Sequence, residues 1–420
     1  MARIICAAPP LVGHLTPLAA LAGMLRERGH EVVVIDYFPK PFCVPEGVQH
    51  VSIPSFGIER AVSVTGRGNV VSESINALRN FCLDVFQETL RHCADFKPDL
   101  LVFDQLLPIA PMIARELQCS YLYTISSPLE FFHKDPSAFP LNKGMAQAFN
   151  GIFGEMCANL SQKLGSKAAA DTCSPGRYLC FATELFCGVS SAESPFATSS
   201  SGTTGGVPVS FIGPAFLQRK PSAEDRAMAA QLAGFGGKRF FVSLGSVIAG
   251  MAPNRESAVK IFRNTLLSHN EQNCLFLFSA PEALLREAFE GLRINATVIA
   301  RPFVNQFYLM DRFSLVFSHG GYNPAAESLF YGVPTIAFPF LFDQGWIAQR
   351  LEELGVGVRI SRVRHTPLML RDHADRLLTA ADVRSGLTAL QADAHRINGR
   401  LRGAEAIEAV LASSEEVVRE

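Results

Sequence analysis

Short apolar runs alternate along the chain with segments whose apolar residues recur at helical spacing. Runs rich in Val, Ile, Leu and Phe predict β-strands at residues 3–8, 31–36, 99–104, 120–125 and 209–214, and at 239–245, 274–279, 297–300, 315–319 and 335–340. Strands that are apolar at nearly every position are typical of parallel sheets covered by helices on both faces. The pattern therefore predicts an α/β protein with two doubly wound, Rossmann-like domains of similar size.

The length of the chain also favours two domains, because one hydrophobic core rarely extends over 420 residues. A loop rich in Ser, Gly and Thr occupies residues 194–208, and a polar segment follows the strand that ends at Pro214. We place the boundary in that polar segment. Residues 1–215 then form an N-terminal domain, 216–237 a linker, 238–400 a C-terminal domain and 401–420 a final helix. The default ligand site is a cleft that the two domains face.

Composition narrows the classes of partner. The formal net charge is -1, so there is no basic excess to bind nucleic acid or anionic lipid. The 10 cysteines include no CxxC pair, which favours free thiols in a reducing cytoplasm and no metal site. Prolines, a glycine and a histidine interrupt the apolar N-terminus, and no long apolar run follows, so neither a signal peptide nor membrane insertion is expected.

Candidate chemistry begins at the end of the first predicted strand. Thr16 suits an N-cap and Pro17 the first helical position, which places His14 in the turn before the helix. Ligands of open parallel sheets bind at this carboxyl edge, where a histidine can act as general base. Asp104 ends the strand at 99–104 and can orient the His14 ring. The alternatives are a loop histidine that caps local backbone and an aspartate that caps the next helix.

The first strand of the second domain ends in small residues at the corresponding edge. Ser243, Gly245 and Ser246 would let backbone and hydroxyl donors approach a phosphate or a base. A plain tight turn is the alternative. The Walker A pattern of phosphate-binding loops is absent from the sequence.

The stretch SHGGYNPAAESLFYGVP, residues 318–334, combines a strand end, a turn and a short helix. Asn323 suits the N-cap, Pro324 the first helical position and Gly332 the stop. An ordinary strand–turn–helix would carry the same signals. The oxyanion hole of lipase-like hydrolases also uses HGG, but it requires a GxSxG elbow that the sequence lacks.

The same stretch has the features of a nucleotide site. Gly320 and Gly321 carry no side chains, so an anion can approach the N–H groups at the helix start, with His319 beside it. Because no metal is expected, the helix dipole and His319 would have to balance the phosphate charge. Glu327, one turn after Asn323, can accept two hydrogen bonds from a diol. Diphosphate at the turn and ribose beside the helix predict a nucleotide.

Two flanking pieces point at the same edge. Val304 and Gln306 precede the stretch, and Asp343 and Gln344 follow the next strand, where a carboxylate beside a carboxamide suits the hydroxyls of a sugar. The alternative for Asp343 is the cap of the following helix. The sequence contains no DxD pair of metal-binding carboxylates.

Taken in order, these residues resemble the donor-binding signature of family 1 glycosyltransferases of the GT-B fold, over residues 301–351. The resemblance implies that Val304 and Gln306 hold nucleobase and ribose, His319, Gly321 and Asn323 the diphosphate, Glu327 the ribose hydroxyls, and Asp343 with Gln344 the sugar. It continues at GHLTPL, VFDQ and SLGS, so His14 and Asp104 match the family's His-Asp dyad and Ser246 its second-domain turn. Pro324 departs from the family, which has Ser or Thr there, and weaker diphosphate contacts are expected.

The resemblance implies an enzyme: an inverting, metal-independent transferase with an N-terminal acceptor domain and a C-terminal donor domain. The expected reaction moves glucose from UDP-glucose, a co-substrate, to a hydroxyl of a small apolar or aromatic acceptor. Phe-rich segments at 37–42, 127–142 and 149–156 could line the acceptor pocket, although core packing explains most phenylalanines equally well. The alternatives are a lipid-linked glycosyltransferase, a sugar-nucleotide epimerase of the same fold, and a non-catalytic donor-binding partner.

Overall fold

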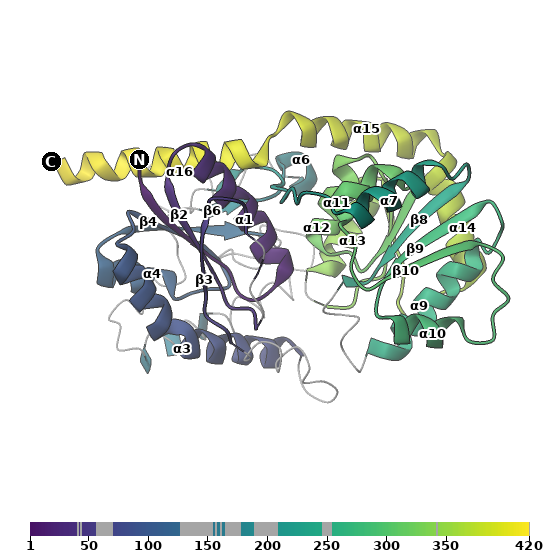
Figure 1. Ribbon diagram of the computed structural model, residues 1–420, viewed down its shortest axis with the longest axis horizontal. Helices are drawn as coiled ribbons and strands as arrows, with labels where there is room; N and C mark the ends of the chain where they lie inside the picture. Colours follow the sequence, from purple (N-terminus) through teal and green to yellow (C-terminus); the bar gives the residue numbers. More distant parts are fainter. Residues whose placement is uncertain are drawn as a thin grey trace. The chain divides into compact units, whose positions relative to one another are not determined.

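The fold is seen in a computed structural model of the chain. It describes residues 1–39, 42, 44–55, 70–126, 154–155, 158–159, 162–163, 178–188, 209–245, 254–341 and 343–419, with backbone alone at 70–75 and 413–419. The chain divides into two compact units (Figure 1). The first comprises Met1–Leu217 and Ile397–Glu420, and the second comprises Gln218–Arg396.

The first unit is built on a parallel sheet in the order β3-β2-β1-β4-β5-β6-β7. Its strands are β1 (Arg3–Ala7), β2 (Glu31–Asp36), β3 (Gln49–Ser52), β4 (Leu100–Asp104), β5 (Ser120–Ile125), β6 (Tyr178–Cys180) and β7 (Val209–Phe211). Its helices are α1 (Val12–Glu27), α3 (Val70–Phe96), α4 (Ala110–Leu117), α6 (Glu184–Cys187) and α16 (Gly399–Arg419). The strand order reverses between β1 and β4.

The second unit repeats this plan with the order β10-β9-β8-β11-β12-β13, again parallel. Its strands are β8 (Lys238–Ser243), β9 (Cys274–Ser279), β10 (Thr297–Arg301), β11 (Leu315–Ser318), β12 (Thr335–Ala337) and β13 (Gly357–Arg359). Its helices are α7 (Ala223–Ala233), α9 (Arg255–Ser268), α10 (Glu282–Phe289), α11 (Gln306–Leu309), η4 (Met310–Arg312), α12 (Tyr322–Phe330), α13 (Gln344–Glu353), α14 (Pro367–Thr379) and α15 (Ala381–Arg396). Here the reversal lies between β8 and β11.

Every strand predicted from an apolar run is present, and the prediction of two doubly wound α/β domains is confirmed. Three further strands, β3, β6 and β13, were missed. Each has only three or four residues, and β3 and β13 form sheet edges where polar residues such as Gln49 and Arg359 are exposed. Short edge strands carry too few buried positions to show a periodic signal.

The predicted domain boundaries need two corrections. Residues 216–237, expected to form a linker, contain α7, whose Met228 and Leu232 pack into one core cluster with Leu309 of the second unit. Residues 397–400, assigned to the C-terminal domain, belong with the final helix α16 to the first unit.

The last helix, α16, packs along α1 (yellow beside purple in Figure 1). A Cβ on Gly403 would lie 2.7 Å from Cδ1 of Leu21, so glycine allows this close approach. At the polar rim, Arg28 donates two hydrogen bonds of 2.7 Å to the Glu408 carboxylate. The first unit is therefore completed by the end of the chain.

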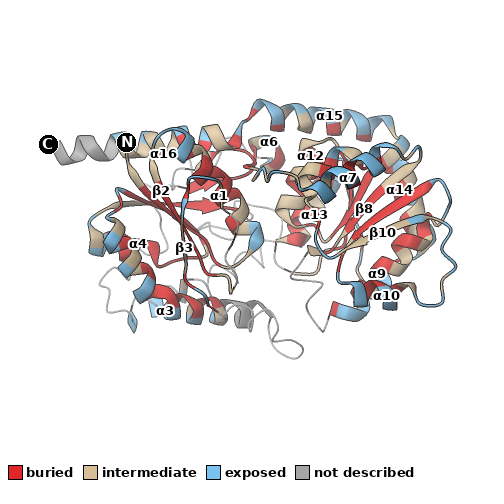
Figure 2. Ribbon diagram, viewed as in Figure 1, coloured by how far each residue is buried: buried red, intermediate tan, exposed pale blue. Residues whose placement is uncertain are grey.

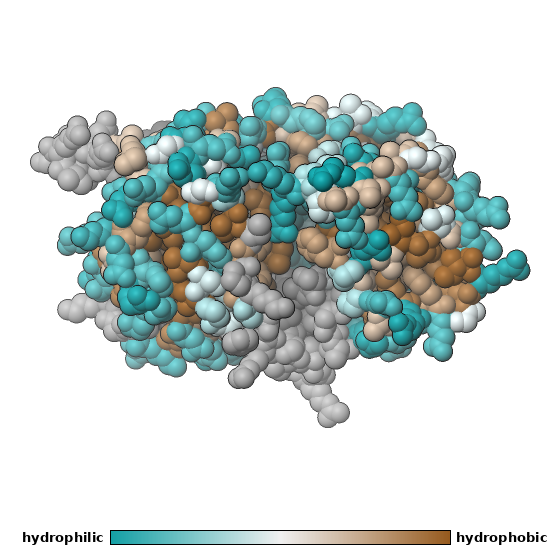
Figure 3. Space-filling view, viewed as in Figure 1, coloured by the Kyte–Doolittle hydropathy of each residue, from teal (hydrophilic) through white to brown (hydrophobic). Residues whose placement is uncertain are grey.

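Phenylalanine is mainly a core residue in the second unit. Phe240 stacks on Phe276, and Phe276 on Phe278, with ring centroids 4.9 and 5.8 Å apart. The central strands of both sheets are buried along most of their length (Figure 2), and hydrophilic residues cover much of the described surface in Figure 3. Core packing accounts for these rings, whereas most of the Phe-rich segments at 127–142 and 149–156 lie outside the described residues. No helix in the described ranges is long and apolar enough to cross a membrane.

Candidate functional site

One group of candidate residues lies in the first unit, where the order of its sheet reverses. Strands β1 and β4 are paired neighbours, with Ala7 opposite Phe103 at their carboxyl ends. Helix α1 follows β1 and carries His14, while Asp104 is the last residue of β4. In doubly wound sheets, ligands usually bind at the carboxyl ends of the strands, at the point where the strand order reverses. The topology therefore brings together two residues that lie 90 positions apart.

His14 and Asp104 are in direct contact. Nδ1 of His14 lies 2.9 Å from Oδ2 of Asp104, which is fully buried, and the other carboxylate oxygen accepts a hydrogen bond from the Leu106 N–H at 3.0 Å. The His14 side chain is 15% exposed, so it can meet a substrate. A carboxylate selects the tautomer with its proton on Nδ1, which makes Nε2 the basic nitrogen.

A third residue, Ser126, was missed by the sequence reasoning. It follows β5, and its Oγ lies 2.9 Å from Nδ1 of His14. Ser126 is 7% exposed. Its position directly after a predicted strand was the only available signal, and serines in such positions are common in loops.

The start of α1 differs from the prediction. The helix begins at Val12, with His14 in its first turn and Pro17 inside it, so Thr16 is not the N-cap. The N–H groups of His14 and Leu15 both donate to the Leu11 carbonyl, at 3.0 and 3.1 Å. Pro17 has no N–H, so the helix lacks one hydrogen bond at this position but continues through it. The Thr16-Pro17 pair therefore indicated that a helix is present but not where it begins.

A separate group of candidate residues lies in the second unit, where the order of its sheet reverses between β8 and β11. Ser243 and Ser318, the last residues of these strands, are paired. The His319 ring follows and lies between two glycines: a Cβ on Gly245 would fall 2.8 Å from its Cε1, and one on Gly321 2.5 Å from its Nε2. Gly245 also has a φ of +75°, which other residues rarely adopt. These glycines are required to accommodate the imidazole.

His319 is neutral in this environment, which corrects the expected charge balance. Burial lowers its pKa to about 4, and the Ser243 backbone opposes this only in part. Nδ1 is buried and makes no hydrogen bond of normal geometry in the described residues. His319 can therefore offer an N–H donor to a phosphate, but it does not bring a positive charge at neutral pH.

Helix α12 begins two residues earlier than expected. Gly321 is the N-cap residue, so Asn323 is the second and Pro324 the third helical residue. Proline is tolerated here because the first N–H groups of a helix have no partner in the helix, although Pro324 then offers none to an anion. The predicted stop is confirmed, because Gly332 adopts a φ of +67° and its N–H donates to the Leu329 carbonyl at 3.1 Å.

Glu327 and Gln306 form the part predicted to hold ribose. Nε2 of Gln306 donates to Oε2 of Glu327 over 2.6 Å. Burial raises the pKa of Glu327 to about 7, while Gln306 and the charge of Arg219 lower it. Burial thus makes the ionised form of this carboxyl group less favourable than it is in water. Val304, two residues before Gln306, is 9% exposed and packs in the core cluster.

The two residues predicted to hold the sugar have different environments. Gln344 is 8% exposed, and its Oε1 accepts hydrogen bonds from the Phe340 and Leu341 N–H groups at 2.9 and 3.0 Å, which leaves Nε2 as the group for a ligand. Asp343 is the N-cap residue of α13, the position that the alternative assigned to it, although its side chain makes no capping hydrogen bond.

One aromatic ring at this edge was also missed. Phe303 follows β10 and is 67% exposed, and the Arg219 guanidinium lies 5.7 Å from its ring centroid. An exposed ring beside a candidate ribose site can stack a base. Ser246, in contrast, lies outside the described residues. Within the described part of the chain, no three His, Cys, Asp or Glu side chains are grouped to hold a metal ion.

Comparison with known proteins finds glycosyltransferases. No family model matches. NDP-glycosyltransferase YjiC of Bacillus subtilis strain 168 is 22% identical over 416 residues, 96% of each chain. Zeaxanthin glucosyltransferase of Pantoea ananas is 28% identical over 116 residues, which is 28% of this chain and 27% of that one. Among solved structures, the calicheamicin glycosyltransferase CalG4 superposes with a TM-score of 0.71 at 19% identity and covers 98% of both chains.

These findings confirm the resemblance drawn from the motifs. The full-length similarity extends through both units and so includes the two sheet reversals where the candidate residues lie. The chain is a relative of the NDP- and UDP-glycosyltransferases and has the GT-B fold.

Proposed function

We propose that the protein transfers glucose from UDP-glucose to a hydroxyl group of a small apolar or aromatic acceptor, with inversion at the anomeric carbon and without a metal ion. The observation that carries the proposal is the 2.9 Å contact between His14 and the buried Asp104 at the reversal of the first sheet. A protein that only bound the donor would have no need for a carboxylate-oriented histidine in its other unit.

The proposed step begins with the acceptor hydroxyl donating its proton to Nε2 of His14. Its oxygen forms a bond to the anomeric carbon as the bond from that carbon to the diphosphate oxygen breaks, and UDP leaves. Asp104 stabilises the imidazolium that forms, because its carboxylate accepts the Nδ1 hydrogen bond. A positioned base of this kind contributes about 10² to 10⁴-fold in rate.

On the donor side, the proposal assigns the leaving diphosphate to His319 and the start of α12. The neutral imidazole would donate a hydrogen bond, and the helix dipole would favour the developing negative charge. Glu327 would accept hydrogen bonds from the ribose hydroxyls, so a deoxyribose nucleotide should bind more weakly. Gln344 would use its Nε2 for the sugar. Glucose and an apolar acceptor are supported by the relative that is named a zeaxanthin glucosyltransferase.

The test is a UDP-release assay with UDP-glucose and a panel of hydroxylated aromatic acceptors. The wild-type protein should release UDP only when an acceptor is present. His14→Ala should lose turnover and retain UDP affinity, whereas Glu327→Ala should lose affinity. His92→Ala, on the outer face of α3 beside Glu88 and Arg91, serves as the matched control and should change neither. UDP binding without release for any acceptor would indicate a non-catalytic donor-binding protein instead.

A further inference from the structure

A cation lies at the nucleoside end of the proposed donor site, on the segment that leads into the second unit. Arg219 comes two residues after the first unit ends, at Leu217, and its guanidinium lies over the exposed ring of Phe303. Its charge also reaches Glu327 and lowers the pKa of that carboxyl group. One guanidinium therefore acts on both the aromatic ring and the candidate ribose-binding carboxylate.

The position of Arg219 is set by contacts inside the second unit. The Arg301 guanidinium, at the end of β10, donates to the Glu224 carboxylate at 2.9 Å, and this ties the first turn of α7 to the strand that precedes Phe303. Met228, further along α7, packs into the same core cluster as Val304. The segment that carries Arg219 is thus held beside the loop that carries Phe303.

We propose that Arg219 is a donor-binding residue: its guanidinium contacts the nucleobase that stacks on Phe303 and offsets the negative charge of Glu327 and of the nucleotide. The inference rests on the proposed nucleotide donor. A base that stacks on Phe303 either lies beneath the guanidinium or displaces it from the ring. In both cases the guanidinium is next to the nucleotide, and it can stack on the base or donate hydrogen bonds to its carbonyl groups.

Charge makes this role important. The donor is an anion, and the residues assigned to hold it include the carboxylates Glu327 and Asp343, while His319 is neutral. A guanidinium keeps its charge at every physiological pH, so Arg219 supplies a permanent positive charge to the nucleoside end. Its removal should weaken binding of the nucleoside more than binding of the diphosphate.

The experiment measures UDP affinity by titration calorimetry, together with inhibition of the transferase reaction by uridine and by inorganic diphosphate. Arg219→Ala should weaken UDP binding about 10-fold, which corresponds to the loss of one charge-assisted contact. It should raise the KM for UDP-glucose similarly and leave kcat at saturating donor unchanged. Arg219→Lys should recover part of the affinity. Arg286→Ala removes an exposed arginine of α10 that is paired with Glu282, and this variant should behave as wild type.

The outcomes separate the inference from the proposed function. If the wild type binds UDP and Arg219→Ala binds it within twofold, the inference is wrong and the proposed function stands. The inference would also be overturned if Arg219→Ala weakened inhibition by uridine and inhibition by inorganic diphosphate equally. The substitution would then affect the whole donor site and not the nucleoside end in particular. If the wild type binds no nucleoside diphosphate, both fail. Thermal unfolding of each variant shows whether a loss of affinity comes from misfolding instead.

Discussion

Each unit holds a histidine that contacts a serine and an aspartate, but the two clusters lie at opposite edges of their sheets. His14, with Asp104 and Ser126, lies at the carboxyl edge of the first sheet, where the strand order reverses. His269 follows α9, near the amino end of β8, whose first residue is Lys238. The two clusters contain the same three residue types, but they lie in different surroundings.

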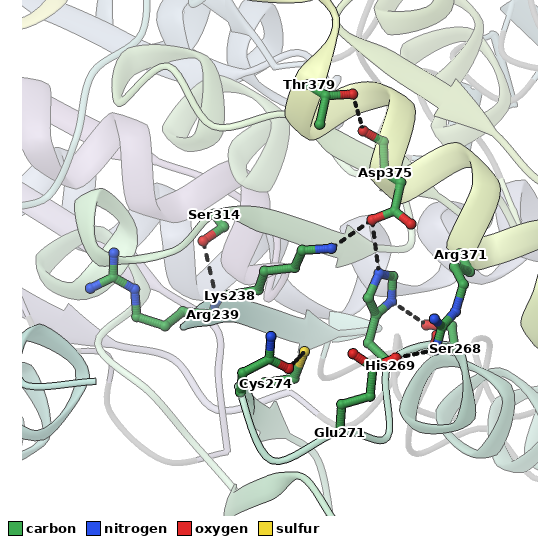
Figure 4. Close-up of polar contacts among 11 residues, drawn as sticks. Lys238, Arg239, Ser268, His269, Glu271, Cys274, Ser314, Arg371, Asp375 and Thr379 are labelled. Carbon is green, nitrogen blue, oxygen red and sulfur yellow. Dashed lines mark hydrogen bonds and ion pairs between the residues drawn. The ribbon is translucent and has the colours of Figure 1, made fainter. Parts of the chain in front are cut away.

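The second cluster uses both nitrogens of its histidine ring (Figure 4). Nδ1 of His269 lies 3.0 Å from the Ser268 hydroxyl and Nε2 lies 3.3 Å from Asp375, which also accepts a 2.6 Å hydrogen bond from Lys238. The Ser268 hydroxyl donates to the Thr265 carbonyl at 2.7 Å, and the His269 side chain is 1% exposed. These contacts tie α9, α14 and β8 together.

The comparison shows that a serine, histidine and aspartate in contact do not by themselves identify a catalytic site. Asp104 and Ser126 both lie within hydrogen-bond distance of Nδ1 of His14, and a carboxylate at Nδ1 selects the tautomer in which Nε2 is the basic nitrogen. Whether such a histidine is catalytic or structural depends on where the cluster lies in the sheet and on which ring nitrogen each partner contacts. We therefore expect the first cluster to control turnover and the second to control stability.

The largest effect should come from Asp104→Asn. An asparagine can donate to Nδ1, which would move the ring proton to Nε2 and remove the base, so turnover should fall about 10² to 10⁴-fold. UDP release at saturating substrates measures it. Asp375→Asn is the matched change in the other cluster and should retain turnover. Similar losses of turnover in the two variants would contradict the comparison.

His269→Ala should lower stability and leave turnover nearly unchanged, which is the reverse of the effect expected for Asp104→Asn. The change leaves Asp375 and Ser268 without their ring partner and removes the contact with Phe240, whose centroid is 4.8 Å from that of the imidazole. The free energy of unfolding should fall by about 1–3 kcal/mol, as measured by urea denaturation, with turnover close to wild type below the transition. His14→Ala should unfold at nearly the wild-type urea concentration.

Ser126→Ala should have a smaller effect on turnover. The hydroxyl shares Nδ1 of His14 with Asp104, and losing one such hydrogen bond, worth about 1 kcal/mol, should lower kcat roughly fivefold. The pH profile of kcat should shift as well, because Ser126 would act through the His14 proton. Ser126→Thr keeps the hydroxyl and should restore most of the rate. An unchanged pH profile in the alanine variant would reduce Ser126 to a packing residue.

The smallest effect concerns the pH dependence of stability. Burial lowers the pKa of His269 below 6.5, as do the charges of Lys238 and Arg371, while Asp375 opposes. The unfolded chain therefore binds this proton more readily, so the contribution is present above pH 6.5 and is lost as the pH falls below it. Wild type should lose more unfolding free energy between pH 7.5 and 5.5 than His269→Ala does. Equal losses would show that His269 does not titrate.

The sequence predicted the sheets and the positions of several candidate residues in the fold because both depend on local patterns. Long apolar runs marked the buried strands, and polar residues at or after the strand ends correctly placed Asp104, His14 and His319 near the carboxyl ends of the strands. The helix starts were less well predicted. Thr16 with Pro17 and Asn323 with Pro324 are strong local signals, but Pro17 is the sixth residue of its helix and Pro324 the third of its helix.

Features that depend on packing between distant segments were not predictable. The neutral state of His319 follows from its burial between Gly245 and Gly321, which lie 76 positions apart by residue number. The roles of Ser126 and Arg219 follow from neighbours that no motif connects to them. The same holds for α16, because its apolar pattern does not reveal which unit it joins.

The return of α16 to the first unit has a consequence for the order in which the chain folds. During synthesis, residues 218–396 emerge from the ribosome before the segment that contains α16. The second unit can therefore form its complete core while the first still exposes the face of α1 around Leu21 that Gly403 later covers. The proposed acceptor-binding unit, although encoded first, is the last to be finished.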